Sequence, residues 1–365
     1  MSGGVDSSTA AAILKDEGSD IVGFSMQLWD QRRNAAEGDE CRPSRCCSIE
    51  DLYDAREVAA RLGFPFYVVD FQKEFESIVV RNFVESYRNG LTPSPCVLCN
   101  SQLKFKSLAH MAKEAGASQL ATGHYARIFY HDGIGRFLLM QAQDKEKDQS
   151  YFLFELSQEQ LAKVIFPLGD FDKEKVRQIA HRYKLPVANK PDSQEICFIP
   201  DGDYAAFIER YYGEASELMR PFSAGKILDS KGRILGTHSG IHHYTIGQRR
   251  GLGIAHTSPL YVLEIRPEEN VVVVGERSLL GKKQCRIVRP NWISIPELAG
   301  PLRVRAKIRS RHAAAWATIA PLEDGNVDVD FDLPQAAISP GQACVFYQGD
   351  VVVGGGWISR IPQDI

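Results

Sequence analysis

The sequence predicts an α/β fold that begins with an open parallel sheet and continues into a small β-rich module and a terminal β-barrel. Strand-like and helix-like segments alternate up to about residue 217, which is typical of parallel βαβ units. From Phe222 onward, short strands separated by turns such as 229–232 and 267–270 take over. A chain of 365 residues is also too long for one comfortable core. We therefore expect three domains: 1–217, 218–278 and 279–365.

Hydrophobic periodicity places the elements of the first domain. A helical segment, Thr9–Leu14, follows the first loop. Further along, the pattern predicts strands at 20–26, 66–69 and 119–122, and helices at 49–62, 71–87, 101–115, 157–164 and 172–183. Ligands of an open parallel sheet bind beyond the carboxyl ends of its strands. We therefore expect Met26, the loop around Cys96 and the pair Gly123–His124 to lie near the ligand.

The first eight residues, Met1 to Ser8, form a loop rich in glycine and serine. Gly3 and Gly4 allow the backbone to turn so that successive N–H groups face one point, and the hydroxyls of the serines add donors. The alanine-rich helix that follows presents its positive end to the same point. The loop is therefore expected to bind an oxyanion. The alternative is an ordinary Gly-Ser turn in which Ser7 or Ser8 caps the helix.

Asp6 and the absence of a lysine distinguish this loop from other phosphate loops. A carboxylate beside a phosphate favours a magnesium ion between the two. The loop has no Gly-Lys-Ser/Thr sequence, so it has no lysine of its own for terminal phosphates. Such a loop normally follows a hydrophobic strand, and we expect that strand to precede residue 1 in the coding region. Its absence would weigh against nucleotide binding.

Composition excludes several classes of protein. The formal net charge is -3, so any binding of nucleic acid would depend on a local basic surface. No apolar run reaches the length of a membrane span, and the polar N-terminus is not a secretory signal, which predicts a cytoplasmic protein without a membrane partner. In this context the eight cysteines are expected to be thiols or ligands rather than a disulfide framework.

Two cysteine clusters carry possible chemistry. The polar loop 29–47 contains Cys41, Cys46 and Cys47; it is either a metal clip or, as we favour for lack of a second ligand pair, a mobile surface loop. Cys96 and Cys99 stand three residues apart at the entry of a predicted helix, whose N-terminal field would lower a thiol pKa.

The role of Cys96, Cys99 and Cys197 has three interpretations from the residues alone. Cys197 could carry a persulfide that Cys99 resolves by thiol–disulfide exchange. The three cysteines could instead ligate an iron–sulfur cluster with one iron left open. They could also be small buried apolar residues.

A set of motifs spans the whole chain in order: SGGVDSS, FSMQLW, TPSPCVLCN, ATGHYAR, KDQSYFL, DSQEICFI, YTIGQRRGLG and PGQ. The first resembles the PP-loop of the ATP pyrophosphatases, which have an adenine nucleotide α-hydrolase-like fold. Together the motifs resemble those of the bacterial-type tRNA-uridine 2-sulfurtransferases. The resemblance implies that ATP adenylates the C2 oxygen of the wobble uridine and that a cysteine persulfide then delivers sulfur, releasing AMP. It also implies a protein that donates sulfur, either a cysteine desulfurase or a relay carrier.

The resemblance also implies roles for single residues, carried over motif by motif. Cys99 would be the nucleophile and Cys197 the persulfide carrier, while Ser94, Pro95 and Cys96 would line the target base. The residues implied to bind ATP are Met1, Ser2, Gly3, Gly4, Val5, Asp6, Ser7, Ser8, Met26 and Gly123. Those implied to bind tRNA are His124, Lys147, Asp148, Gln149, Arg309, Ser310 and Gln342. Many members have Asp at position 96, and the cysteine here adds weight to the cluster alternative.

A basic segment predicts an RNA surface independently of the family. Residues 302–311 alternate so that, in a strand, five cations would share one face. Tyr244 with Gln248, Arg249 and Arg250 forms a second, weaker patch. The alternative for the first face is neutralisation by acids such as Glu323 and Asp324.

Two further sets of residues are expected to be structural. We expect no shared metal at His242 and His243, because neighbours in a strand point to opposite faces. Cys285 and Cys344 are expected to be packing residues.

Two other functions remain open from the sequence. A PP-loop amidotransferase or synthetase of a small metabolite would adenylate its acceptor without needing Cys197 or the basic segment. A non-enzymatic RNA-binding protein with a degenerate nucleotide fold is the other possibility.

Overall fold

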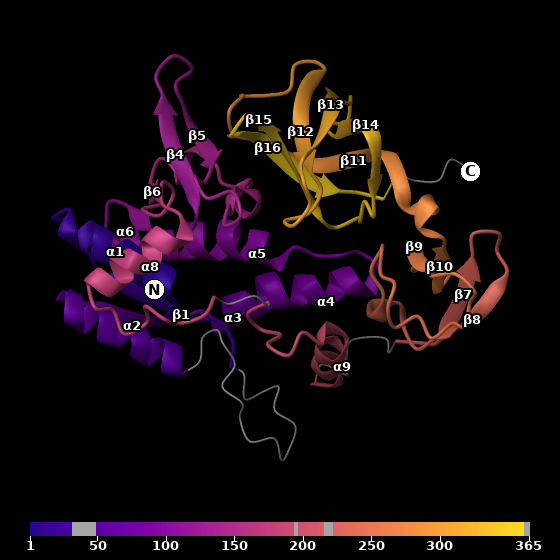
Figure 1. Ribbon diagram of the computed structural model, residues 1–365, viewed down its shortest axis with the longest axis horizontal. Helices are drawn as coiled ribbons and strands as arrows, with labels where there is room; N and C mark the ends of the chain where they lie inside the picture. The colour runs from indigo at the N-terminus through magenta and orange to yellow at the C-terminus, as the bar shows by residue number, and fades with distance from the viewer. Residues whose placement is uncertain (31–48, 193–195, 215–221, 361–365) are drawn as a thin grey trace. The chain divides into compact units, whose positions relative to one another are not determined.

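The structure is a computed structural model that describes residues 1–30, 49–192, 196–214 and 222–360 (Figure 1). The chain divides into two compact units, each assembled from segments far apart in the sequence. The first unit contains residues 1–80, 95–203 and 349–352, and the second contains 81–94, 204–348 and the residues from 353 onward.

The first unit contains the predicted parallel strand pairs. β1 (Gly23–Gln27) pairs in parallel with β2 (Phe66–Asp70), and α2 (Ile49–Leu62) lies between them in the chain. β3 (Leu120–Ala121) pairs in parallel with β6 (Val164–Ile165). Parallel strands joined through helices confirm the α/β class, and the predicted limits of α2 match those observed.

Two helices of the first unit fix the N-terminal loop. α1 (Val5–Asp16) directly follows the loop and contacts α8 (Lys173–Arg182). Val5 and Ala12 of α1 share a buried cluster with Ala180 of α8 and with Val58 of α2. The small alanine side chains let the helices approach closely, and burial of this face holds the start of α1 in place.

The helix that carries Cys96 and Cys99 is longer than predicted. It starts at Pro95 and runs through α5 (Pro95–Leu98), the π-helical η3 (Cys99–Leu108) and α6 (Ala109–Glu114). Proline suits the first turn of a helix because its missing N–H would have no intrahelical partner there. Cys99 begins the π-helical segment, a geometry that is common at functional sites.

Several other predictions for this part of the chain need correction. The predicted helix 71–87 is divided into α3 (Gln72–Phe75), π-helical η2 (Glu76–Val80) and α4 (Arg81–Arg88), the last in the second unit. The predicted helix 157–164 is only α7 (Gln158–Leu161), opened by a capping box between Ser157 and Gln160. Two further features were not predicted from the sequence. They are the hairpin of β4 (Ala126–His131) and β5 (Arg136–Gln141) and the 3-10 helix η4 (Ser150–Leu153).

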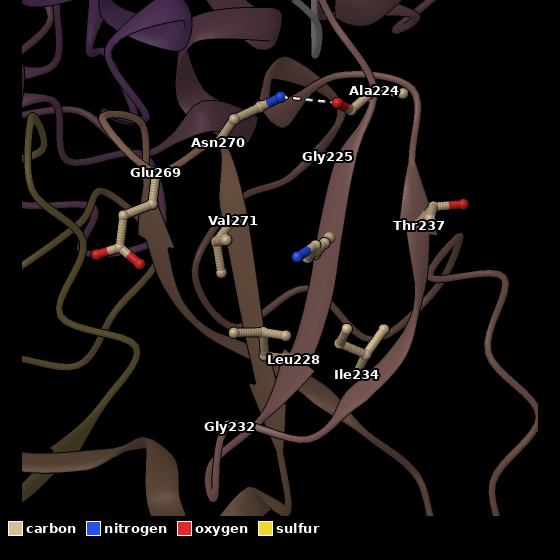
Figure 2. A pocket seen from close by; sticks show the side chains of 10 residues that line it. Ala224, Gly225, Leu228, Gly232, Ile234, Thr237, Glu269, Asn270 and Val271 are labelled. Carbon is tan, nitrogen blue, oxygen red and sulfur yellow. Dashed lines mark hydrogen bonds between the residues drawn. The ribbon is translucent and has the colours of Figure 1, made fainter.

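The second unit includes a small sheet with strand order β8-β7-β10-β9. Its strands are β7 (Gly225–Asp229), β8 (Ile234–His238), β9 (Tyr261–Arg266) and β10 (Val271–Gly275). β10 is buried along its whole length. Figure 2 shows an open groove on this sheet, lined by residues that include Lys226, Leu228, Thr237 and Asn270. None of the residues predicted from the sequence to bind ATP, sulfur or tRNA lines this groove.

The predicted terminal barrel is confirmed as six strands in the order β11-β14-β13-β12-β15-β16, closed by pairing of β11 with β16. The strands are β11 (Gly281–Trp292), β12 (Leu302–Lys307), β13 (Ala315–Pro321), β14 (Val327–Ala336), β15 (Ala343–Gln348) and β16 (Val351–Ile358). Cys285 and Cys344 belong to the buried barrel cluster, as expected for packing residues.

Two shorter elements of the second unit complete the fold: α9 (Tyr204–Glu214) and the 3-10 helix η5 (Ile241–His243). A further 3-10 turn, η6 (Arg277–Leu280), precedes β11. Among the described residues, no helix combines the length and the apolar character needed to cross a bilayer.

The barrel core gives a stability prediction with a matched control on the same strand. Phe331 is 1% exposed and Leu333 is 71% exposed, and both lie on β14. Phe331→Ala should lower the free energy of unfolding by about 3–5 kcal/mol, because it removes buried contacts and leaves a cavity. Leu333→Ala should change it by no more than about 0.5 kcal/mol. Urea unfolding measures both, and equal losses would show that the barrel core is assigned wrongly.

Candidate active site

The N-terminal loop leaves the start of α1 open. Gly4 is the N-cap residue, and no side chain caps the helix. Ser7 and Ser8 lie inside the first turn, so the interpretation that one of them caps the helix is wrong. The N–H groups of a first helical turn have no intrahelical acceptor and carry a partial positive charge. The start of α1 is therefore available to an anion.

Two glycines hold this loop against neighbouring backbone. Gly3 has φ +68°, and a Cβ there would lie 2.2 Å from the carbonyl oxygen of Asp51 in α2. A Cβ at Gly123, two residues beyond β3, would lie 2.7 Å from the backbone nitrogen of Ser7. Any side chain at either position would displace the loop. Gly123 therefore touches the first turn of α1, as the sequence predicted for a residue beyond the carboxyl end of a strand.

The donors of the loop fit a phosphate group. The hydroxyl oxygens of Ser2 and Ser7 are 3.2 Å apart. The buried hydroxyl of Ser8 makes no hydrogen bond within the described part of the chain. A buried polar atom without a partner is costly, and an oxyanion at the open end of α1 would use such donors.

Two lysines from distant parts of the sequence supply the positive charge that the loop lacks. The Lys190 ammonium donates to the Gly3 carbonyl at 3.0 Å and to Asp51 and Asp54 at 2.5 Å each. Burial lowers the pKa of Lys190, but the two aspartates outweigh it, so the pKa is raised and the side chain stays charged. Lys190 was not predicted as a site residue, because it belongs to none of the motifs in the sequence.

Lys173 makes the second connection, directly to Asp6. Its ammonium lies 2.7 and 2.9 Å from the two carboxylate oxygens of Asp6. The Tyr125 hydroxyl also donates to Asp6, at 2.8 Å. We expected a magnesium ion to balance the charge of Asp6, whereas here the cation beside it is a lysine. The magnesium ion stays a prediction, and Asp6 does not require it.

The same lysine connects the loop to the segment that carries Cys197. Lys173 lies 2.7 Å from Asp192, which also pairs with Lys147 at 2.8 Å and Arg177 at 3.3 Å. Burial raises the pKa of the Asp192 carboxyl, but the hydrogen bonds from Lys147 and Lys173 outweigh it and hold the pKa below its usual value. Asp192 is the first residue of the DSQEICFI motif. Its position is therefore set by the charges around Asp6.

Cys99 is buried, and this reverses one prediction. Burial raises the pKa of its thiol, while the nearby Lys104 ammonium lowers it less. The expectation of a lowered thiol pKa at the helix start is wrong for Cys99, because desolvation of a thiolate outweighs the field of the helix. Cys96 is exposed and Cys197 is half-buried. The neighbour of Cys197, Phe198, packs edge-on against Phe75 with ring centroids 5.5 Å apart.

Cys96, Cys99 and Cys197 form no disulfide among the described residues, nor do they gather around one ion. Within the described ranges, one group of three possible metal-ligating side chains has its ligand atoms within 4.8 Å of one another. The group consists of Glu209, His242 and His243. A single metal ion is therefore not held by these three thiols in this arrangement. The predicted loop of Cys41, Cys46 and Cys47 lies outside the described residues.

Lys104 also connects Cys99 with the strand end beside the loop. The charge of Lys104 acts on both Cys99 and His124, and burial is the larger of the two effects that lower the pKa of His124. The ring of His124 packs against Phe105 in a tilted arrangement and edge-on against Phe166, and its Nδ1 atom is 2.8 Å from the Thr122 hydroxyl. His124 follows Gly123 directly, and Phe105 belongs to η3, the segment that begins at Cys99.

Three residues predicted to bind tRNA make contacts within the first unit. Lys147 pairs with Asp192, as described above. Asp148 accepts hydrogen bonds from Ala142 and Ser150. The side-chain oxygen of Gln149 accepts from the backbone N–H of Tyr125 at 3.0 Å. Gln149 therefore holds Tyr125 in place, and the contact of all three residues with tRNA stays a prediction.

In the second unit, Gln342 contacts the two residues that precede Ser94. The side chain of Gln342 donates to the carbonyls of Thr92 and Pro93, at 3.1 and 2.9 Å. Ser94 is the next residue and is buried. Met26, in the first unit, lies near the end of β1. Gln342 therefore positions the segment that the sequence assigned to the target base.

The basic segment is a strand only in part. β12 ends at Lys307, so Arg303, Arg305 and Lys307 share its outer face, while Arg309 and Arg311 lie in the following turn. Arg303 pairs with Asp332 and stacks over Trp316, its guanidinium carbon 5.2 Å from the ring centroid.

On this face, Arg303 is therefore paired with Asp332 rather than with Glu323 or Asp324. Arg309 donates to the carbonyl of Ala336 at 3.2 Å, which anchors the turn where Ser310 follows.

The second predicted basic patch is not one surface. Tyr244 is buried, and burial is the main cause of its raised pKa. Gln248 uses its amide to bind the backbone of His243, Thr245 and Arg250. Only Arg249 and Arg250 of the four are exposed.

Comparison with known proteins gives matches over the whole length. A family model described as "tRNA methyl transferase HUP domain" matches residues 1–201, and a "tRNA methyl transferase PRC-barrel domain" matches 216–276. An "Aminomethyltransferase beta-barrel domain" matches 282–358. These three descriptions follow the α/β segment, the small β-rich segment and the barrel in order.

Relatives match almost the entire chain. The tRNA-specific 2-thiouridylase MnmA of Acidobacterium capsulatum is 52% identical over 364 residues, which covers 98% of this chain and 97% of the relative. The protein of the same name from Koribacter versatilis is 52% identical over 360 residues with the same coverage. A solved U34-tRNA thiolase NcsA from Methanococcus maripaludis, with its [4Fe-4S] cluster, covers 60% of this chain and 71% of its own at 18% identity. Its TM-score of 0.33 is too low to support a conclusion.

The environment of Cys99 predicts its reaction with iodoacetamide. The thiol should react slowly at neutral pH. Its rate should begin to rise at a higher pH than the rate of an exposed thiol does, because burial raises the pKa of Cys99. Lys104→Met should slow the reaction at pH 8.5 by about 2- to 10-fold, since it removes the charge that favours the thiolate.

Lys106→Met is the control for this experiment, because Lys106 is exposed and does not act on Cys99. Mass spectrometry with peptide fragmentation separates Cys99 from Cys96. Rapid alkylation of Cys99 at pH 7 in the wild type would contradict the assignment.

Proposed function

The chain belongs to the tRNA-specific 2-thiouridylase family, and from this premise we propose that it converts the wobble uridine of tRNA to 2-thiouridine with consumption of ATP. The observation that carries the proposal is the open start of α1, which Lys173 connects through Asp6 to Asp192, the first residue of the motif that contains Cys197. Gly123 lies against the backbone of Ser7 in the first turn of α1, and His124 packs against Phe105 of the helical segment that begins at Cys99. An enzyme that activates a base and then transfers sulfur to it needs these parts together.

We propose that the first half-reaction takes place at the N-terminal loop. ATP binds to residues 1–8, Met26 and Gly123, with its phosphates at the open end of α1. The C2 oxygen of the uridine attacks the α-phosphorus, the bond from the α-phosphorus to the bridging oxygen breaks, and pyrophosphate leaves. Lys190 and Lys173 stand close enough to the loop to balance the charge of the leaving group. A magnesium ion, if bound near Asp6, would add positive charge to the phosphates.

The second half-reaction uses the cysteines. The terminal sulfur of a persulfide on Cys197 attacks C2, a carbon–sulfur bond forms, and AMP leaves. The Cys99 thiolate then attacks the Cys197 sulfur, which breaks the sulfur–sulfur bond to the base and leaves a Cys99–Cys197 disulfide. A cellular dithiol reduces this disulfide, and a cysteine desulfurase or relay protein supplies the next sulfur. The raised pKa of Cys99 would keep it a thiol until the bound substrate changes its surroundings.

We propose that residues of each unit contact tRNA. Ser94, Pro95 and Cys96 would line the extruded base, because a wobble nucleotide in a single-stranded loop unstacks at low cost. His124, Lys147, Asp148 and Gln149 would border this pocket. On the second unit, Arg309, Ser310 and Gln342 and the cations of β12 would meet phosphates.

The surface beside β12 supports this placement. Trp316 is 53% exposed and lies next to Arg303, a combination suited to stacking on RNA. The division into domains 1–217, 218–278 and 279–365 is part of this proposal, and the limits of the three family matches support it.

The alternative chemistry uses an iron–sulfur cluster on Cys96, Cys99 and Cys197. Cysteine at position 96, where many family members have aspartate, is the feature that favours it. Anaerobic purification followed by iron and sulfide analysis, with a thiolation assay before and after removal of any cluster, separates the two. Loss of thiolation activity when the cluster is removed would overturn the persulfide proposal. Full thiolation activity in protein without iron would overturn the cluster alternative.

Cys197→Ser tests the proposed sulfur transfer. The variant should lose formation of 2-thiouridine by at least about a hundredfold, because a serine hydroxyl cannot form the persulfide that the proposal assigns to Cys197. It should still release pyrophosphate from ATP when unmodified tRNA is present, since adenylation does not use Cys197. Nucleoside analysis by mass spectrometry and a pyrophosphate assay measure the two half-reactions separately.

Cys285→Ala, in the barrel core, is the control and should change neither half-reaction by more than a few-fold. Wild-type thiolation by Cys197→Ser would refute the persulfide role. Pyrophosphate release that does not depend on tRNA would instead favour an adenylating enzyme that acts on a small metabolite.

A further inference from the structure

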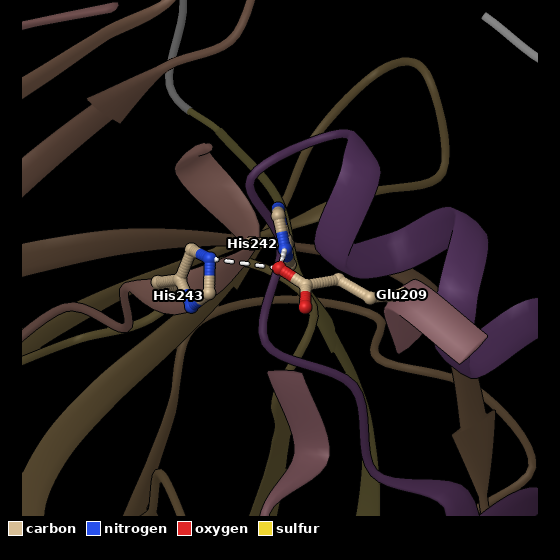
Figure 3. Close-up of side chains that lie close together, drawn as sticks. All are labelled: Glu209, His242 and His243. Atoms are coloured by element: carbon tan, nitrogen blue, oxygen red, sulfur yellow. Dashed lines mark hydrogen bonds and ion pairs between the residues drawn. The ribbon is translucent and has the colours of Figure 1, made fainter. Parts of the chain in front are cut away.

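Three side chains of the second unit that could ligate a metal ion converge at one point (Figure 3). They are Glu209 of α9 and the neighbours His242 and His243 of η5. The Nε2 atoms of both histidines lie 3.2 Å from the same carboxylate oxygen of Glu209. The three ligand atoms all lie within 4.8 Å of one another.

This convergence depends on a local structure that the sequence did not predict. In a strand, adjacent histidines would point to opposite faces, and no shared metal was expected on that ground. The observed element is a 3-10 helix, in which the two rings lie nearly side by side, with centroids 4.1 Å apart. Both imidazoles can therefore face Glu209.

The surroundings hold these side chains in place. The His242 ring stacks on Phe222, with centroids 3.7 Å apart, and is 1% exposed. The Tyr204 hydroxyl, at the start of α9, donates to the carbonyl of His243 at 3.2 Å. Preorganised ligands lose little conformational entropy when they bind an ion.

The spacing matches the requirements of zinc. Zinc binds histidine nitrogen and carboxylate oxygen at about 2.0–2.1 Å in tetrahedral geometry, so two of its ligand atoms lie about 3.3 Å apart. Both nitrogen–oxygen distances here are 3.2 Å. The two imidazole nitrogens lie within 4.8 Å of each other.

An unsatisfied atom provides a second, independent observation. Nε2 of His243 is buried and makes no hydrogen bond with good geometry among the described residues, although it faces the Glu209 carboxylate. Buried polar atoms without partners are rare. Glu209 is 52% exposed, so an ion could reach the site from solvent and keep a water in its fourth position.

We propose that Glu209, His242 and His243 bind one zinc ion with three protein ligands and one water. The ion would connect α9 to η5 within the second unit and stabilise that connection. This site is separate from the thiols and does not depend on the proposed thiolation. The competing explanation is that the two histidines merely share the carboxylate as hydrogen-bond donors.

The test uses the full-length protein stripped of metal. Cobalt(II) serves as a spectroscopic substitute for zinc, because nitrogen and oxygen ligands give visible d–d bands without the near-ultraviolet charge-transfer band of thiolates. The wild type should take up one cobalt ion with such a spectrum, and added zinc should displace it. Glu209→Gln and His243→Gln should each weaken zinc binding by about tenfold or more, measured against a chromophoric chelator.

His256→Gln is the matched control, because His256 is an exposed histidine elsewhere in the second unit. It should bind zinc as the wild type does. Zinc should also raise the Tm of the wild type and of His256→Gln, but not that of Glu209→Gln. Because the Tm of each metal-free variant is measured first, loss of folding is distinguished from loss of binding. A thiolate-type spectrum alone, or equal zinc affinity in all variants, would overturn the proposal.

Discussion

The ion pair network of Lys173 is the interaction on which the candidate active site depends. One ammonium, 13% exposed, lies between Asp6 of the phosphate loop and Asp192 of the Cys197 segment. Without Lys173, the carboxylates of Asp6 and Asp192 would lose a shared positive charge. The loss of these charged hydrogen bonds should lower the free energy of unfolding by about 1–3 kcal/mol. The same contact places a cation beside the N-terminal loop, which has no lysine of its own. Charge balance in the loop and the position of Asp192 therefore have one cause.

A second chain of contacts serves the other cysteine. Gly123 is confined by the backbone of Ser7, so the end of β3 cannot move away from the start of α1 without opening a gap. His124, the next residue, packs against Phe105 of η3, the segment that begins at Cys99. Burial raises the pKa of the Cys99 thiol, which favours its protonated form.

The sequence predicted the parts of the site that are local in the chain. The Gly-Ser loop followed by alanines, the parallel pair β1–β2 and the barrel all follow from periodicity and glycine content. Lys173 and Lys190 could not be predicted, because their roles come from contacts across 136 to 187 residues of sequence. Asp192 was not predicted either, and its partner Lys147 is 45 residues away. The pKa of Cys99 was predicted in the wrong direction for the same reason: burial is a tertiary property. The metal-ligand geometry of His242 and His243 was missed because the segment was assigned to a strand.

A double-mutant cycle between Lys173 and Asp192 tests the central claim most directly. Lys173→Met, Asp192→Asn and the double variant would be compared in their free energies of unfolding and in tRNA-dependent pyrophosphate release. The network predicts that the double variant is more stable than the sum of the single losses implies, with a coupling of about 1–2 kcal/mol. It also predicts that each single variant releases pyrophosphate more slowly. Additive losses within about 0.5 kcal/mol, together with unchanged pyrophosphate release, would contradict the account.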